Sequence, residues 1–313
     1  MSGLATLGET MGLVVQDGCG HVHNGEPMTL RMGGSESNVA IGVRRLGVPA
    51  AWVGRLGADP PGALIRRELR AERVEVIAVE DPAPTGMMLR WRPAVGRGRV
   101  SYYRRDSAGS HLAPEDVPGS VIADADVVHA TGITPALGPA PAAAVRRAIE
   151  LARDAGTTVS FDVNHRDALW SREVAAEAIA ALLPACDLAF AGLEEARMIT
   201  GPAVDGPAAA RALERLGPSQ VMIKLGPAGC VARIDGADYE QAAPTVPVLD
   251  TIGAGDAFVA GYLAELISGA DPIQRLRTAV TAGALAVTAP GDWEGLPDRD
   301  ALARLRSEEP VIR

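Results

Sequence analysis

The sequence predicts an α/β fold in which a mostly parallel sheet carries a small, separate β-sheet lid. First, strand and helix patterns alternate between residues 126 and 225, as they do in parallel sheets. Second, short β patterns at roughly 11–32 and 85–105 precede that alternation, and such insertions commonly cover the ligand-binding ends of the strands. Third, a composition of 47% hydrophobic and 22% charged residues is typical of globular proteins. We therefore expect a single domain over residues 1–313, with the lid at 11–32 and 85–105.

The N-terminal half begins with β elements and a glycine turn that leads into a helix. The dipeptide Asn24-Gly25 is typical of a hairpin turn. After residues 33–35, apolar side chains recur at spacings of three and four, which predicts a helix that ends at Gly47. A second helix is expected at 62–72, and strands are expected at 4–8, 12–17, 28–32, 50–54, 74–79, 85–91 and 99–103. We expect the last three strands to form a small sheet of their own.

The C-terminal half carries the regular alternation. Its expected strands are 126–131, 158–162, 186–191 and 220–225, and the helices among them are 140–155, 172–183, 193–200 and 207–216. A hairpin at 229–233 and 237–243 and helices at 256–268 and 272–288 follow. This order predicts a parallel sheet with helical crossovers.

Charge and hydropathy exclude several classes of partner. The chain has 30 basic and 39 acidic side chains and a formal net charge of -9, so we expect no nucleic acid partner. No stretch approaches the ~20 apolar residues of a membrane helix, and the N-terminus lacks a charged segment followed by an apolar run. The three cysteines have no CxxC spacing. We expect a cytoplasmic protein without a membrane partner.

The segment 250–258 is the most informative stretch for chemistry. It reads DTIGAGDAF, with two glycines and Asp256 at the start of a strongly apolar helix. Backbone N–H groups at a helix N-terminus attract anions, so an acid there suggests a partner such as a substrate hydroxyl. The alternative is that Asp256 only caps the helix after a flexible turn.

This segment resembles the C-terminal signature of the ribokinase-like (PfkB) carbohydrate kinases. The family's second signature is similar to residues 33–40, GGSESNVA, followed by 46–47 and 54–59. Residues 192–201 and 224–229 resemble two further family segments, so the resemblance runs essentially end to end. It implies a doubly wound sheet flanked by helices with a β-sheet lid, and transfer of the γ-phosphoryl group of ATP to a primary alcohol with Mg²⁺ present. Whether the reaction also needs a monovalent cation is left open by the resemblance.

The resemblance also implies roles for individual residues. Asp256 would be the general base, and the N–H groups of Gly253, Ala254 and Gly255 would form an anion hole for the transferring phosphoryl group. The residues implied in ATP binding are Lys224, Gly226, Gly229, Gly253 and Gly255.

Alternatives stay open for several of these residues. Instead of binding ATP, Lys224 could be a surface residue, and Gly226 and Gly229 could only form a hairpin turn. The resemblance implies that Glu195 acts on Mg²⁺ without binding it directly; the alternative is that Glu195 belongs to a solvated helix N-terminus. Many relatives have Asn three residues before that Glu, where this chain has Gly192.

The substrate is suggested by a narrower resemblance, to 2-keto-3-deoxygluconate kinases. Residues 102–108, YYRRDSA, and 161–170, FDVNHRDALW, resemble segments of that subfamily. Arg104 and Arg166 would clamp a carboxylate, as the fixed fork of a guanidinium does. The other residues implied in contact with the sugar acid are Gly33, Gly34, Asn38 and Tyr102. Where the subfamily often has Tyr, this chain has Met87-Met88, so the pocket is expected to differ there.

Other functions stay open. A fructokinase, a ribokinase or a nucleoside kinase of the same family would have less use for a carboxylate clamp. A catalytically silent sugar- or nucleotide-binding regulator would not need Asp256. A Rossmann dehydrogenase is disfavoured, because no GxGxxG follows the first strand. A homodimer or higher homo-oligomer through the apolar lid is also open.

Overall fold

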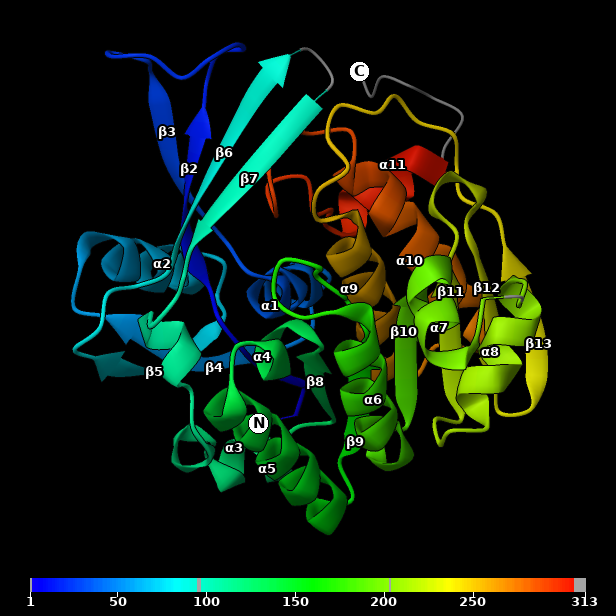
Figure 1. Ribbon diagram of the computed structural model, residues 1–313. Coiled ribbons are helices and arrows are strands. Elements are labelled where there is room, and N and C mark those ends of the chain that lie inside the picture. The colour runs from blue at the N-terminus through cyan, green and yellow to red at the C-terminus, as the bar shows by residue number, and fades with distance from the viewer. Residues whose placement is uncertain (1, 95–96, 203, 307–313) are drawn as a thin grey trace.

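A large, mostly parallel sheet forms the centre of the molecule. The computed structural model describes residues 2–94, 97–202 and 204–306 (Figure 1). The sheet order is β13-β12-β11-β10-β9-β8-β1-β4-β5, and only β12 and β13 run antiparallel to their neighbours. Its strands are β1 (Leu4–Leu7), β4 (Ala50–Gly57), β5 (Glu75–Asp81), β8 (Val127–Thr131), β9 (Thr158–Asp162), β10 (Leu188–Gly192), β11 (Gln220–Lys224), β12 (Cys230–Ile234) and β13 (Ala237–Gln241).

Helices cover both faces of this sheet, so its central strands are buried along their whole length rather than at alternate residues. One core cluster joins α1, α2, α9 and α10 to the sheet, and a second joins α5, α6 and α8 to the other face. The helices are α1 (Ser35–Arg45), α2 (Pro60–Ala71), α3 (Gly119–Ala123), α4 (Ile133–Ala136), α5 (Pro139–Ala155), α6 (Arg172–Leu182), α7 (Leu193–Thr200), α8 (Gly206–Glu214), α9 (Ala254–Ile267), α10 (Pro272–Ala286) and α11 (Arg299–Arg306). The expected doubly wound α/β fold is confirmed.

The second sheet is separate and has four strands in the order β3-β2-β6-β7. They are β2 (Met11–Gln16), β3 (Met28–Gly33), β6 (Met87–Ala94) and β7 (Arg97–Tyr103). We call this sheet the lid; it stands at the upper left of Figure 1. The turn before β3 contains Asn24 and Gly25, and Gly25 has the positive φ of 80° that such turns need. Residues 95–96, within the range expected for the lid, lie outside the described residues.

One strand expected in the small sheet belongs to the large one. The strand expected at 74–79 is present as β5, but its assignment to the small sheet was wrong: β5 pairs in parallel with β4 from Ala51↔Glu75 to Gly57↔Asp81. The connection through α2 makes a βαβ unit, which places consecutive parallel strands side by side. As the edge strand, β5 is only partly buried, so its polar pattern resembles that of a lid strand. The short helices α3, α4 and α11 were also not predicted.

Helix α9 lies at the centre of the molecule, between the sheet and α10. Its residues from Asp256 to Glu265 are all buried. A helix that is apolar on all sides needs neighbours on all sides, and α9 has them in α1, α10 and the sheet. The N-terminus of α9, which carries Asp256, is thereby held in place next to the lid. Within the described part of the chain, no helix has the length and apolarity to cross a membrane.

Candidate active site

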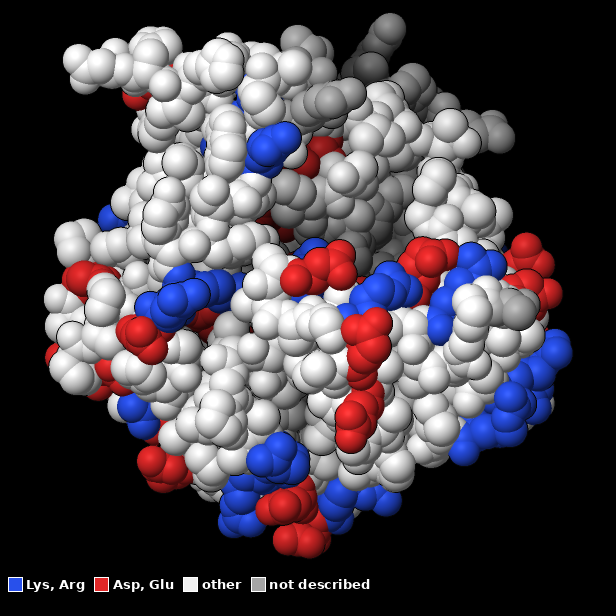
Figure 2. All heavy atoms as spheres, in the orientation of Figure 1, with Lys and Arg blue, Asp and Glu red and all other residues white. Residues whose placement is uncertain are grey.

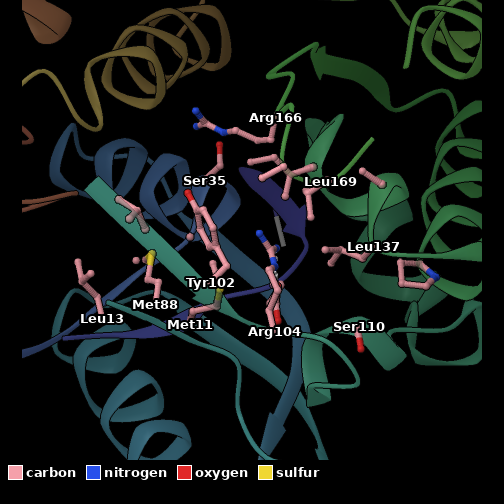
Figure 3. A pocket seen from close by; sticks show the side chains of 18 of the residues that line it. Met11, Leu13, Ser35, Met88, Tyr102, Arg104, Ser110, Leu137, Arg166 and Leu169 are labelled. Atoms are coloured by element: carbon pink, nitrogen blue, oxygen red, sulfur yellow. Dashed lines mark hydrogen bonds and ion pairs between the residues drawn. The ribbon is translucent and has the colours of Figure 1, made fainter. Parts of the chain in front are cut away.

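A cavity of about 710 Å³ lies between the lid and the N-terminus of α9. Figure 2 shows the hollow, with acidic atoms visible in its depth. The structure brings together there all the residues that the sequence implied for the sugar: Gly33, Gly34, Asn38, Tyr102, Arg104, Arg166 and Asp256. In Figure 3 the hydroxyl end of Tyr102 points toward Ser35, and Arg166 extends over the same part of the cavity.

Asp256 is held from both sides by the start of α1. Ser35 Oγ donates to Asp256 Oδ1 at 2.7 Å, and Asn38 Nδ2 donates to Asp256 Oδ2 at 2.8 Å. Asn164, just after β9, donates in turn to Ser35 Oγ at 2.7 Å. The N-cap position of α9 is Gly253, and no side chain caps it, so the capping interpretation of Asp256 is wrong. Its carboxylate is instead fixed with one edge toward the cavity.

Burial raises the pKa of Asp256 above its usual value. The hydrogen bonds from Asn38 and Ser35 and the charge of Arg166 act against this rise and keep the carboxylate form accessible. A carboxylate with raised proton affinity is a better proton acceptor than one in water. The arrangement therefore suits a general base.

The glycines before Asp256 leave backbone donors free at the helix N-terminus. No group in the described ranges accepts a hydrogen bond from the N–H of Gly253, Ala254 or Gly255. Gly253 has a φ of 76°, and a Cβ there would lie 1.9 Å from the carbonyl oxygen of Asp292. A Cβ on Gly255 would meet nothing nearer than Lys224 Nζ at 3.7 Å. Gly253 is thus required by the turn, whereas Gly255 faces open space that an anion can enter.

Lys224 is a largely buried, ion-paired cation rather than an exposed surface residue. Its Nζ donates to both carboxylate oxygens of Asp162 at 2.8 Å, and its side chain is 18% exposed. Burial raises the pKa of Asp162 to about 6 against the opposing charge of Lys224. Burial lowers the pKa of Lys224, but the surrounding carboxylates outweigh this and raise it, so the ammonium stays charged. The carboxylate of Asp162, the last residue of β9, thereby holds this ammonium close to Gly255.

The remaining residues implied for ATP and Mg²⁺ have structural partners. Gly226 and Gly229 form the turn between β11 and β12, with φ values of 60° and 101°. A Cβ on Gly229 would lie 2.0 Å from the carbonyl oxygen of Gln241, so the turn requires glycine. Glu195 accepts hydrogen bonds from the N–H groups of Gly192 at 2.6 Å and His165 at 2.9 Å. Across the described ranges, no three His, Cys, Asp or Glu side chains converge as a metal site.

The two arginines of the expected clamp differ in their surroundings. Arg104 forms an ion pair with Glu9, whose side chain is fully buried, and its Nε donates to Glu9 Oε2 at 2.7 Å. Arg104 also lies over the ring of Tyr102, 5.7 Å from its centroid. Arg166 is exposed to the cavity, and its guanidinium forms no ion pair or hydrogen bond with the rest of the described chain. Of the two, Arg166 has the cation that is free for a ligand.

Several residues of the cavity were not singled out from the sequence. Ser35 stood within a motif, but only the fold brings it into contact with Asp256 and with Asn164, which lies beside the cavity. Glu9 follows the first strand without a distinguishing pattern. Asp292 lines the cavity from the loop after α10, beside Gly33, where a Cβ would lie 2.2 Å from Asp292 Oδ2. No sequence signal marked Asp292, because it follows no strand and belongs to no recognised motif.

The titration of Asp292 predicts how stability depends on pH. Burial raises its pKa to about 7, although Arg90 lowers it. The folded protein therefore keeps a proton that the unfolded chain loses near its ordinary pKa of ~4, so the free energy of unfolding falls as pH rises through 7. From about pH 5 to about 7, we expect a slope that approaches ~1.4 kcal/mol per pH unit in urea denaturation and levels off above pH 7. Asp292→Asn should flatten this slope; an unchanged slope would assign it to another group.

Comparisons with known proteins support the relation suggested by the motifs. The model of the pfkB family carbohydrate kinases matches residues 1–299. A 2-dehydro-3-deoxygluconokinase of Bacillus subtilis (strain 168) is 33% identical over 312 residues, 98% of this chain and 96% of that protein. A 2-dehydro-3-deoxygluconokinase of Thermoproteus tenax is 39% identical over 271 residues, 84% of this chain and 82% of that protein.

Kinases of neutral sugars and solved structures match as well. A fructokinase of Klebsiella pneumoniae is 34% identical over 281 residues, 87% of this chain and 91% of that protein. The crystal structure of a PfkB protein from Polaromonas sp. JS666 has a TM-score of 0.87 and 32% identity, and the match covers 96% of this chain and 99% of that one. The sequence relatives thus include kinases of acidic and of neutral sugars.

Proposed function

This chain belongs to the pfkB family of carbohydrate kinases, and we propose that it phosphorylates an acidic keto-sugar, 2-keto-3-deoxygluconate, to its 6-phosphate with MgATP. A phosphotransferase that acts on a sugar hydroxyl is the activity of the family. The acidic acceptor is carried by one observation: the unpaired guanidinium of Arg166 lies in the same cavity as Asp256. The relatives named 2-dehydro-3-deoxygluconokinase support it, since that name denotes the same sugar acid.

The residues of the site support a direct transfer. Asp256 takes the proton of the 6-hydroxyl, the freed oxygen forms a bond to the γ-phosphorus, and the bond to ADP breaks. Ser35 and Asn38 hold the carboxylate in place for this step. The N–H groups of Gly253, Ala254 and Gly255 stabilise the negative charge on the transferring phosphoryl group.

MgATP is the second substrate of the proposed reaction. The open space at Gly255 fits an entering phosphate, and the ammonium of Lys224 lies 3.7 Å from that point. Lys224 would hold the phosphates, with Gly226 and Gly229 shaping the adjoining loop. Glu195 would act on Mg²⁺ through water, because Mg²⁺ keeps several of its waters and takes most other ligands from the phosphates.

The carboxylate contact predicts a specific effect of Arg166→Ala. We expect kcat/KM for the keto-acid to fall about 10- to 100-fold, because a charge-assisted hydrogen bond contributes ~1.5–3 kcal/mol. ATP affinity should not change. Steady-state kinetics on the keto-acid and on fructose measure this. Arg172→Ala is the control, since Arg172 is exposed and its side chain donates to the backbone oxygen of Glu194, away from the cavity lining.

Arg104 does not offer the same test. Removing it would leave the buried charge of Glu9 unpaired, which typically costs about 3–5 kcal/mol of stability. Loss of activity in an Arg104 variant would therefore reflect folding.

The test of the carboxylate contact is therefore Arg166→Ala alone. Wild-type kcat/KM on the keto-acid in Arg166→Ala would contradict the carboxylate contact.

A neutral-sugar kinase is the second candidate. It is favoured by the fructokinase relative and by Met88, which lines the cavity and brings no hydroxyl donor. ATP-dependent ADP release with 2-keto-3-deoxygluconate, 2-keto-3-deoxygalactonate, fructose, ribose and adenosine separates the candidates. Turnover confined to the keto-acids supports the proposal; turnover confined to neutral acceptors replaces the substrate and keeps the kinase. Silence on all acceptors would favour a binding protein.

Self-association and a cytoplasmic location stay predictions. The lid face turned away from the cavity exposes Met28, Leu30 and Tyr103, apolar surface of the kind that a second copy covers. Light scattering at micromolar concentration tests this. All three cysteines are free, as a reducing compartment favours.

A further inference from the structure

The cavity face of the lid carries two arginines that reach across to the other wall. Arg31 in β3 pairs with Leu13 of β2, and Arg90 in β6 pairs with Val15 of the same strand. Successive side chains of a strand point to opposite faces of a sheet. Arg31 lies opposite Leu13, and Arg90 lies two residues after Met88, so both arginines project from the face that carries the cavity-lining Leu13 and Met88. Their partners lie at the N-terminal side of α9 and in the loop after α10.

Arg90 contacts the segment that leads into α9. Its Nη1 lies 3.1 Å from Asp250 Oδ2 and 3.4 Å from Asp292 Oδ1, and its side chain is only 6% exposed. Asp250 in turn accepts hydrogen bonds from the N–H groups of Ile252 at 3.2 Å and Gly291 at 3.4 Å. Arg90 thus binds the carboxylate that fixes the shape of the DTIGAGD segment.

Arg31 contacts the neighbouring loop, residues 291–294. Its Nη1 lies 2.8 Å from Glu294 Oε1, while Glu294 Oε2 accepts hydrogen bonds from the N–H groups of Asp292 at 2.9 Å and Trp293 at 3.2 Å. The carbonyl of Asp292 packs directly on Gly253, with no room for a methyl group between them. A displacement of this loop would therefore displace Gly253.

We propose that Arg90 is a positioning residue that couples the docking of the lid to the shape of the anion hole, with Arg31 as a second point of attachment. The lid closes one side of the sugar cavity, and Arg90 reaches Asp250 only when the lid lies against the body. The N–H groups of the anion hole therefore reach the positions needed for phosphoryl transfer only when the lid closes the cavity. This inference rests on the proposed role of Gly253, Ala254 and Gly255.

Arg90→Met tests the coupling, because Met keeps much of the apolar stem and removes the guanidinium. We expect kcat to fall about 100-fold with little change in ATP affinity, since a small misplacement of reacting groups costs about that much. Hydrogen–deuterium exchange in residues 250–257 should quicken. The control is Arg99→Met on the exposed outer face of the lid, which should keep wild-type kcat and exchange.

A second variant separates positioning from charge balance. Arg90→Met leaves Asp250 and Asp292 without their cation, so the chain could be destabilised by that alone. In the double variant Arg90→Met/Asp250→Asn the unpaired charge of Asp250 is gone, and Asn keeps an oxygen for the N–H of Ile252. Since Asp292 stays without its cation, we expect thermal stability to recover in part while kcat stays low.

Two outcomes would overturn the inference: wild-type kcat in Arg90→Met, or recovery of kcat together with stability in the double variant. The second outcome would mean that Arg90 only neutralises Asp250. Failure of the proposed function is distinguishable, because it would appear in the wild-type protein as no turnover of the keto-acid, or as full activity in Asp256→Asn, whatever Arg90 does. An inactive Asp256→Asn beside a fully active Arg90→Met would reject the positioning role alone.

Discussion

Asp256→Asn is expected to lower kcat by about 10²- to 10⁴-fold, because general-base catalysis contributes that much. The amide keeps the size of the side chain, and its oxygen can still accept from Ser35 Oγ, but it cannot take up the hydroxyl proton. Its nitrogen replaces the oxygen that accepts from Asn38 Nδ2, so the Asn38 amide has to turn its unbonded oxygen toward that nitrogen. Since burial raises the pKa of Asp256, removal of its charge should not lower stability. Sugar and ATP affinities should stay near wild type by calorimetry.

The matched control for this change is Asp271→Asn. Asp271 is the N-cap residue of α10, the next helix along the chain, and its side chain accepts from the N–H of Gln274 at 3.0 Å. Asn caps helices about as well as Asp, so this variant should keep both stability and kcat. An Asp256→Asn enzyme within tenfold of wild-type kcat would reject Asp256 as the base.

Gly253→Ala is expected to lose about 10²- to 10³-fold in kcat, the usual effect of losing one donor from an oxyanion hole. The methyl group would overlap the carbonyl of Asp292, 1.9 Å away, so the loop or the helix start must move. The variant should also lose stability, since a left-handed conformation costs a residue with a Cβ about 1–2 kcal/mol. Steady-state kinetics and thermal unfolding measure both effects.

Substitutions at two other glycines separate the effect of backbone strain from the effect on the anion hole. Gly269 has the same φ of 76° and no atom within 4 Å of its Cβ position, so Gly269→Ala should lose stability and keep kcat. Gly255→Ala should fold normally, because its methyl group meets only Lys224 Nζ at 3.7 Å, yet lose activity by occupying the path of the phosphate. Full activity in Gly255→Ala would place the phosphate elsewhere.

The sequence by itself determined the fold class, the family and the segments of the site. Strand and helix alternation is a local property of side chains, and the DTIGAGD and GGSESNVA strings are contiguous, so both can be recognised without coordinates. The same holds for Asp256, which a motif marks as the acid at a helix start. Local patterns predicted the strand β5 but not its sheet, because the partly polar sequence of an edge strand does not say which strand it pairs with.

Only the tertiary structure decided how the charges are paired. Arg104 and Arg166 look alike in sequence, yet a buried partner 95 residues away occupies the first and leaves the second free. The end of a strand can place a lysine on the surface as easily as in a site. In the structure the carboxylate of Asp162 holds Lys224 in a largely buried position. Arg90, Asp250 and Asp292 meet only because the lid folds back on the body. Pairing depends on distances between segments remote in the chain, and no local pattern of residues carries those distances.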